Sequence, residues 1–345
     1  MEKSGKQTDV RVITLKRWNL PQSRSLHQIW QENGSAEPYG DYISFQSYHF
    51  IDVSPVDTSS ERGIFPAAYE VVTRARQGNE GDKSKDIYIQ QSMVVYGEAN
   101  GFWVDKPEVL YLTMIQLTNR PDLDMPKLQA DIRALFQTRG VPEDRWALYY
   151  SLDFCDLILF VRDIPMSAAQ DILWSLAPVR SGAMEQIRDT VTVYGLDFSR
   201  VMESFDRYAD GGAPEWGHPE EEVTLSLSLG VQKLNAWTSL KREVERLPGV
   251  RSTCFRALGR YDVQLVLEHV SFFQMLQVLW WIDHACGREH NNAFGCYEVV
   301  PLAPWQDLGV RGQSDRVDHE FLSGADRTLG RLFQIYTAVL KGAGE

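Results

Sequence analysis

The sequence predicts an α+β protein made of tandem ferredoxin-like units, each a β-α-β-β-α-β segment with an antiparallel sheet, followed by a C-terminal helix. Two observations lead to this fold class. The same order of strand and helix patterns occurs in residues 106–205 and again in residues 223–304. Both segments also place an aspartate, Asp156 or Asp262, at the hairpin between their two central strands, ahead of an apolar run. Internal repetition of this kind marks a repeated supersecondary unit.

The unit at 106–205 opens with the apolar and β-branched run 109–118, which is typical of a strand. Apolar residues at helical spacing predict a helix over 127–139, and Gly140 fits its C-terminal cap. The remaining expected elements are strands at 146–154 and 156–161, a helix at 167–176 with Ser167 as its N-cap, and a strand at 190–198.

A linker is predicted over 206–222, because glycine, proline and acidic residues gather there. The unit at 223–304 then begins with a strict alternation of apolar and hydroxyl residues over 223–230, the pattern of a half-buried strand. The elements expected after it are a helix at 234–247, strands at 250–258 and 263–268, an apolar helix that Ser271 caps and that runs to His284, and a strand at 294–302.

Residues 1–105 are predicted to form a divergent α+β unit, and they are a candidate third ferredoxin-like copy. Strands are expected at 10–18, within 42–53 and at 87–97, with helices at 25–31 and 67–76. The last strand ends in Val-Tyr-Gly, as does the unit at 106–205. The tail at 305–345 contains an apolar stripe that predicts a helix over 317–340, which either docks on the body or pairs with a partner subunit.

Composition narrows the function classes. The chain of 345 residues has a formal net charge of −12. Nucleic-acid binders gain much of their affinity from a basic surface, so this balance argues against direct nucleic-acid binding. The N-terminal residues contain no apolar core of a signal peptide, and no run approaches the ~20 apolar residues of a membrane span. With four cysteines and no signal, a cytoplasmic protein with reduced thiols is expected.

One hairpin resembles a known family. Residues 257–266, Ala-Leu-Gly-Arg-Tyr-Asp-Val-Gln-Leu-Val, are similar to the effector-domain hairpin of Lrp/AsnC-type regulators, where a Gly-x-Tyr-Asp turn precedes an apolar strand. The likeness spans 223–302 and, more faintly, 109–198. It implies an ACT-like module that senses a small ligand, an amino acid or a nucleotide, and that associates with itself. Those regulators carry a helix-turn-helix, which residues 1–105 do not show, so DNA binding is not carried over.

The candidate ligand-binding residues are those of the two hairpins, Asp156, Gly259, Tyr261 and Asp262. Turn chemistry offers a second interpretation of the same residues. A tight hairpin needs a residue that tolerates positive φ and an aspartate that forms hydrogen bonds within the turn. Both interpretations stay open at this point. No catalytic residue, no metal site and no cofactor is predicted.

Enzymes remain the alternative. Nucleotidyl cyclases and polymerase palms share the β-α-β-β-α-β unit, but their two-metal chemistry needs several converging carboxylates, and the first strands at 110–118 and 223–231 contain no acidic residue. An α+β-barrel enzyme could use the open face of a sheet. The residues His284, Cys286, His290 and Cys296 are of metal-binding types, but their spacing is not that of common zinc sites.

The sequence therefore predicts a non-enzymatic regulatory, ligand-sensing or interaction protein. Its tandem units would bind a small molecule or a partner where two sheets meet, within the chain or across a dimer. The alternative is a palm-like or α+β-barrel-type enzyme that has lost most of its catalytic residues.

Overall fold

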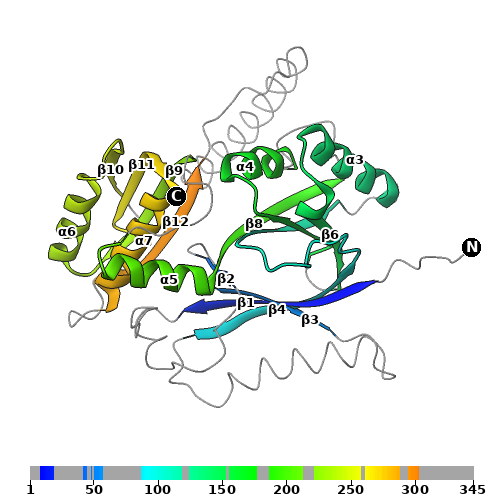
Figure 1. The fold of residues 1–345 in the computed structure, drawn as a ribbon, viewed down its shortest axis with the longest axis horizontal. Helices are drawn as coiled ribbons and strands as arrows, with labels where there is room; N and C mark the ends of the chain where they lie inside the picture. The colour runs from blue at the N-terminus through cyan, green and yellow to red at the C-terminus, as the bar shows by residue number, and fades with distance from the viewer. Residues whose placement is uncertain are drawn as a thin grey trace, which may run out of the picture. The chain divides into compact units, whose positions relative to one another are not determined.

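Strands β1 to β8 close into one barrel in the computed structural model (Figure 1). The order of strands around the barrel is β1-β3-β2-β8-β5-β7-β6-β4, and every pair is antiparallel. The strands are Asp9–Trp18 (β1), Tyr42–Ile43 (β2), Phe50–Pro55 (β3), Ile87–Gly97 (β4), Val109–Leu117 (β5), Trp146–Ser151 (β6), Leu157–Arg162 (β7) and Ile187–Asp197 (β8). The structure describes residues 8–18, 42–44, 48, 50–56, 87–118, 124–152, 155–176, 186–212, 221–257, 261–287 and 294–302.

The barrel consists of two sheets with the same strand order. The run β4-β1-β3-β2 and the run β8-β5-β7-β6 each place the fourth strand beside the first and the first beside the third. This is the order of a β-α-β-β-α-β unit. Two seams join the sheets edge to edge, one between β2 and β8 and the other between β4 and β6. Each seam therefore pairs the second strand of one sheet with the fourth strand of the other.

A separate four-stranded antiparallel sheet follows, with the order β10-β11-β9-β12. Its strands are Glu222–Val231 (β9), Arg251–Arg256 (β10), Val263–Ser271 (β11) and Phe294–Leu302 (β12). The order is again that of one ferredoxin-like unit, so the predicted α+β fold class with antiparallel sheets is confirmed. Within the described ranges, β10 pairs only with β11 and β12 pairs only with β9.

Five α-helices are described, together with a 3-10 turn at Glu143–Arg145. They are Met125–Thr138 (α3), Met166–Ser175 (α4), Phe198–Ala209 (α5), Leu234–Val244 (α6) and Phe272–Gly287 (α7). Ser271 and Gln274 form a capping box at the start of α7: the Gln274 N–H donates to Ser271 Oγ at 3.2 Å, and the Ser271 N–H donates to Gln274 Oε1 at 2.9 Å. The N-cap predicted at Ser271 is confirmed.

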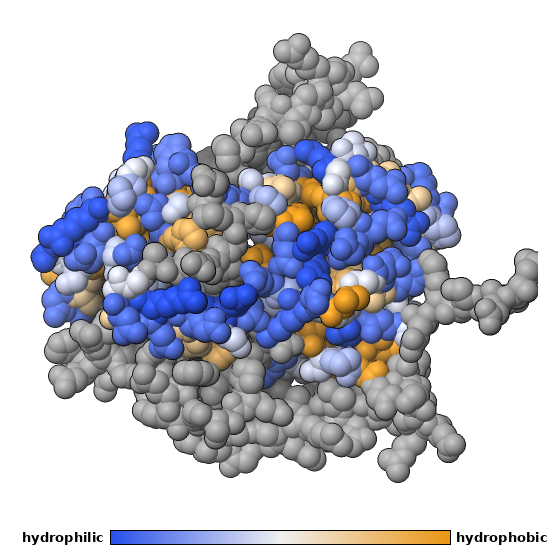
Figure 2. All heavy atoms as spheres, in the orientation of Figure 1, coloured by the Kyte–Doolittle hydropathy of each residue, from blue (hydrophilic) through white to orange (hydrophobic). Residues whose placement is uncertain are grey.

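Helix α5 was not predicted, and its last residues fall at the start of the expected linker. The Asp197 side chain accepts a hydrogen bond from the Arg200 N–H at 3.0 Å and so caps the helix. Val201 and Phe205 lie on its buried face, while Figure 2 shows the outward face of α5 as hydrophilic. A capping aspartate followed by apolar residues at helical spacing was the signal in the sequence.

Ser167 is not the N-cap of α4, contrary to the sequence-based expectation. The helix begins one residue earlier, after Pro165. Its first N–H groups are bound instead by Glu221: Met166 N donates to Oε2 at 2.9 Å and Ser167 N to Oε1 at 2.7 Å. A carboxylate is favourable at a helix N-terminus, because the unpaired N–H groups there carry partial positive charge. Glu221 lies 55 positions after Met166, so local sequence patterns do not predict this cap.

The strands expected within residues 1–105 are confirmed at Asp9–Trp18, Tyr42–Ile43, Phe50–Pro55 and Ile87–Gly97. The helices expected at 25–31, 67–76 and 317–340 lie outside the described residues. The chain separates into two units, Met1–Ala303 and Pro304–Glu345, and the second also lies outside them. None of the described helices is long and apolar enough to span a bilayer.

The barrel sheet is buried on both faces. One apolar cluster fills its interior and another covers its outer face beneath the helices. Strand β5 shows the division, since Leu110, Leu112 and Met114 point inward while Tyr111 and Ile115 point outward. This double burial explains why β5 reads in the sequence as a continuous apolar run, whereas β9 alternates.

Candidate functional site

The two hairpin aspartates form the same hydrogen bonds in their respective units. Asp156 Oδ2 accepts from the Leu117 N–H at 2.7 Å, and Asp262 Oδ2 accepts from the Val231 N–H at 2.8 Å. The backbone N–H of each aspartate donates to a carbonyl of the first strand of its unit, at 3.0 Å and 2.9 Å respectively. Each aspartate thereby ties the end of the first strand, β5 or β9, to the hairpin between the second and third strands.

The geometry favours the turn interpretation of these aspartates. Both carboxylates have a backbone donor, and no group of three metal-binding side chains occurs among the residues that the structure describes. The Tyr261 hydroxyl donates to Glu298 Oε2 at 3.1 Å, and Gly259 lies outside the described residues. Tyr261 and Asp262 are consecutive residues of one hairpin, and Asp156 belongs to the other. Ligand binding by these residues stays a prediction.

Removal of either aspartate should cost stability. Asp262→Ala and Asp156→Ala each leave a strand-end N–H without its charged acceptor, and both bonds are solvent-exposed, so we expect a loss of about 1 kcal/mol in the free energy of unfolding. Urea unfolding measures it. Asp262→Asn, which keeps an acceptor oxygen, should lose less. Equal stability of the alanine variants and the parent chain would contradict this assignment.

The third sheet presents one face that is unlike either face of the barrel. Leu225, Leu227 and Leu229 of β9 are buried with α6 and α7, so Thr224, Ser226 and Ser228 point to the opposite face. The strand register adds other residues to that opposite face, which we call the hydroxyl face: Arg251, Thr253, Phe255, Gln264, Val266, Glu268, Glu298, Val300 and Leu302. Gln264 Nε2 donates to Ser226 Oγ across it at 3.0 Å.

Two large apolar side chains are exposed on the edges of the hydroxyl face. Phe255 on β10 is 51% exposed and Leu302 at the end of β12 is 39% exposed. Neither residue was predicted from the sequence as part of a site. Their signal was an aromatic residue and a leucine placed, by strand alternation, on a face otherwise rich in hydroxyl groups.

Phe255 occupies the position that Tyr149 has in the barrel. Tyr149 pairs across β6 and β7 with Ile158, two positions after the hairpin aspartate of its unit. Phe255 pairs across β10 and β11 with Gln264, two positions after the equivalent aspartate. Tyr149 is fully buried, because β6 lies at the seam with β4.

Leu302 occupies the position of Gly195. Leu302 pairs with Thr224 of β9, and Gly195 pairs with Leu110 of β5. Thr224 precedes Leu229, whose carbonyl accepts the Asp262 N–H, by as many positions as Leu110 precedes Ile115, whose carbonyl accepts the Asp156 N–H. The shared Val-Tyr-Gly ending relates Gly195 in turn to Gly97 of β4, the residue that pairs with Tyr149 at the barrel seam. Phe255 and Leu302 therefore correspond to the two residues that meet when the barrel sheets join.

The polar side chains around Tyr149 in the barrel bind one another. The Tyr149 hydroxyl donates to Asp9 Oδ2 at 2.5 Å and accepts from Trp103 Nε1 at 3.0 Å. Arg11 binds the same Asp9 oxygen at 2.7 Å and stacks over the Trp103 ring at 4.1 Å. These contacts belong to the packing at one end of the barrel, where Phe102 is also fully buried.

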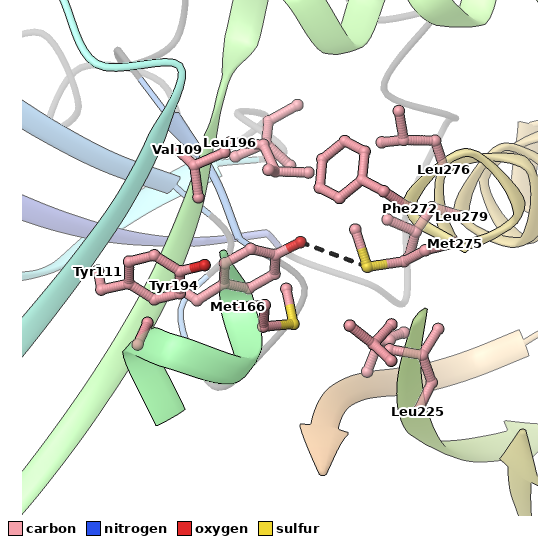
Figure 3. Close-up of a cluster of buried hydrophobic side chains, with 14 of the residues drawn as sticks. Val109, Tyr111, Met166, Tyr194, Leu196, Leu225, Phe272, Met275, Leu276 and Leu279 are labelled. Carbon is pink, nitrogen blue, oxygen red and sulfur yellow. Dashed lines mark hydrogen bonds between the residues drawn. The ribbon is translucent and has the colours of Figure 1, made fainter. Parts of the chain in front are cut away.

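Helix α7 packs on the outer face of the barrel sheet through a cluster of buried side chains (Figure 3). The Tyr194 hydroxyl contacts Met275 Sδ at 3.5 Å, and Phe272, Leu276 and Leu279 of α7 are buried in the same cluster. The Tyr111 and Tyr194 rings lie 5.9 Å apart. Burial raises the pKa of both phenols well above their ordinary value of 10.0, so both keep their protons at neutral pH.

These phenols predict a loss of stability in alkali. Below about pH 10 both the folded and unfolded chains keep the protons; above it the unfolded chain releases them while the folded chain retains them. The free energy of unfolding should therefore fall by about 1.4 kcal/mol per pH unit for each buried tyrosine. Urea unfolding between pH 9 and pH 11 checks this, and Tyr194→Phe should lower the slope. An unchanged slope in that variant would contradict the assignment.

Among known proteins, similarity to this chain was found only with solved structures. No family model matches the chain, and no curated protein matches it. The chlorite dismutase candidate TA0507 is 13% identical, with 55% of this chain and 95% of that chain covered and a TM-score of 0.37. A heme-binding protein from Thermus thermophilus is 9% identical, covering 55% and 92%, with a TM-score of 0.37. A mutant chlorite dismutase from Candidatus Nitrospira defluvii is 15% identical, covering 58% and 94%, with a TM-score of 0.22.

The sequence-based prediction of a non-enzymatic regulatory or ligand-sensing protein is wrong on these findings. The similar structures are described as chlorite dismutases and a heme-binding protein, and none of these three is described as a regulator or a cyclase. These structures are under 25% identical to the chain and have TM-scores below 0.5, so they assign no activity to it. The resemblance of 257–266 to the Lrp/AsnC hairpin is tested by none of them and stays a prediction.

Proposed function

We propose that this chain is a self-associating protein in which the third sheet closes a second barrel with the third sheet of another copy. The observation that supports the proposal is the contrast between edges. In the barrel, the second and fourth strands of both sheets are paired across seams. In the third unit, the equivalent strands β10 and β12 have no seam partner among the described residues.

Pairing of a second strand with a fourth strand, as at the barrel seams, would also join two copies of this chain. If β10 of each copy pairs with β12 of the other, the contact is repeated by a two-fold axis and closes on itself. Closure removes exposed strand edges, which otherwise invite uncontrolled pairing. It also brings Phe255 of one copy against Leu302 of the other and removes both exposed apolar side chains from water.

The seam between copies would be looser than the seams within the barrel. A Cβ on Gly97 would lie 2.8 Å from the Leu148 carbonyl oxygen, so glycine is required for the close approach there. Leu302 has a side chain at the equivalent place, and neighbouring Pro301 has no N–H to donate. Side-chain contacts between Phe255 and Leu302, rather than a complete hydrogen-bond ladder, would therefore hold the copies together.

The buried tyrosines Tyr111 and Tyr194 do not offer heme iron a tyrosinate ligand. Heme iron is bound by histidine, by thiolate, by methionine with histidine, or by tyrosinate. The sequence has no histidine between His49 and His218. The buried Tyr111 and Tyr194 keep their protons, and Met275 and its neighbours on α7 occupy the space beside Tyr194. A specific amino-acid or nucleotide ligand and a cytoplasmic location stay predictions.

Light scattering coupled to size-exclusion chromatography tests the proposed function. A mass of twice 39.4 kDa at micromolar concentration, falling on dilution, is the expected result. A constant monomer mass over the whole concentration range would overturn the proposal.

A further inference from the structure

The β4–β5 loop, residues 98–108, crosses one end of the barrel from one seam to the other. It begins directly after Gly97, which pairs with Tyr149 at the β4–β6 seam. Near its far end, Lys106 Nζ lies 2.6 Å from Asp197 Oδ2, and Asp197 belongs to the β2–β8 seam. The loop therefore reaches both lines along which the two barrel sheets meet.

Two aromatic side chains of this loop close the end of the barrel. Phe102 is fully buried, and its ring lies 6.0 Å from the ring of Phe160, which points into the barrel. The Trp103 ring lies 5.2 Å from the same phenylalanine, and Trp103 Nε1 donates to the Tyr149 hydroxyl at 3.0 Å. The two rings of the loop thus cover side chains of the barrel interior at this end.

The backbone of the loop is held by Arg162 and Asp163 at the end of β7. Arg162 Nη1 donates to the carbonyl of Phe102 and, at 2.8 Å, to the carbonyl of Asp105. Asp163 Oδ1 accepts from the Glu108 N–H at 2.8 Å. The loop leaves the barrel end only when these hydrogen bonds break.

Few backbone pairs join the two barrel sheets at the seams. Among the described residues, β2 and β8 pair through two residues each and β4 and β6 through three. Within the sheets, by contrast, β1 and β4 pair through ten and β5 and β8 through nine. Parting the sheets at a seam therefore breaks fewer hydrogen bonds than parting β5 from β8.

From this arrangement we propose that the β4–β5 loop is a conformational latch. Its release opens this end of the barrel along the seams while both sheets stay folded, so the barrel interior is exposed there without global unfolding. Such a partial opening needs less free energy than unfolding of the chain, because the long strand pairings within each sheet are kept.

Hydrogen exchange of the full chain, resolved by peptide mass spectrometry, tests the latch. Segments 94–97 and 149–152 at the β4–β6 seam should exchange together with the loop. Both should exchange faster than segment 110–116 of β5, which lies between β7 and β8. Exchange of the seam only in step with 110–116 would show that the barrel opens by global unfolding alone and would overturn the proposal.

Gly101→Val strains the latch without removing a contact. Gly101 has a φ of 82°, which a β-branched residue adopts only at a cost, and the nearest atom to a Cβ placed there is Asp144 Cβ at 3.9 Å. The strain disappears when the loop is released, so exchange of the loop and of both seam segments should rise about tenfold.

Gly140→Val is the matched control. Gly140 follows α3, has a φ of 69°, and no atom lies within 4 Å of a Cβ placed there. The substitution imposes the same kind of strain outside the loop, so it should leave exchange of the seam segments unchanged. Equal acceleration of the seam by Gly101→Val and Gly140→Val would contradict the latch, because the seam would then respond to any loss of global stability.

Two milder changes at the same position complete the test. Gly101→Ala strains the turn with a smaller side chain and replaces the valine variant if that chain does not fold. Gly101→Asn should restore most of the slow exchange, because asparagine adopts the left-handed region more readily than other residues with a side chain. Faster exchange of the loop with an unchanged seam in Gly101→Val or Gly101→Ala would also overturn the proposal.

Discussion

Replacement of Phe255 by glutamate is expected to convert the dimer to a monomer. The proposed seam buries two copies of Phe255 against two copies of Leu302, and each glutamate would bring an unpaired carboxylate into that contact. Burial of an unpaired charge costs several kcal/mol, so the dissociation constant should rise by at least ~100-fold. Sedimentation equilibrium or light scattering at several concentrations measures the change.

A control separates this effect from a general response to surface charge. Val104→Glu also places a carboxylate on an exposed apolar position, but in the loop between β4 and β5, away from the third sheet. That variant should dimerise like the parent chain. If Phe255→Glu and Val104→Glu had the same mass as the parent at every concentration, β10 would not be the seam.

Leu276→Ala is expected to destabilise the fold by about 2–5 kcal/mol. Leu276 is fully buried on α7, in the cluster that joins the helix to the outer face of the barrel sheet (Figure 3). The substitution removes most of a side chain from a packed interior and leaves a cavity that its neighbours fill only in part. Urea unfolding followed by tryptophan fluorescence gives the difference in free energy.

Leu234→Ala is the matched control for that measurement. Leu234 is the first residue of α6 and is exposed, so its truncation should change stability by less than about 0.5 kcal/mol. Equal losses for the two leucine variants would show that α7 does not contribute its buried stripe to the core. A loss confined to Leu276→Ala would support the packing in Figure 3.

Local patterns in the sequence were sufficient for most elements. Helix α7 begins directly after Ser271, the predicted N-cap, and Phe294–Leu302 has the predicted bounds. Capping and alternation act over a few residues, so they leave a readable trace. Glu221 shows the limit, because its partners on α4 are far away in sequence and no periodicity points to them.

The candidate site also divides into features that local sequence patterns predicted and features that depend on tertiary contacts. The sequence identified the hairpins of Asp156 and Asp262 as equivalent, and the structure shows that they make the same hydrogen bonds. It did not identify Phe255 and Leu302, because exposure on a sheet edge depends on which strands find partners.

By itself, then, the sequence determined the repeated β-α-β-β-α-β order, the antiparallel sheets and the equivalence of the hairpins, since each depends on neighbours along the chain. Only the tertiary structure decided that two of the sheets close into a filled barrel, while in the third sheet β10 and β12 each pair with one strand among the described residues. The physical reason is that strand edges pair through backbone groups that every residue carries, so the choice of partner is set by the assembled sheets and leaves little trace in the order of side chains.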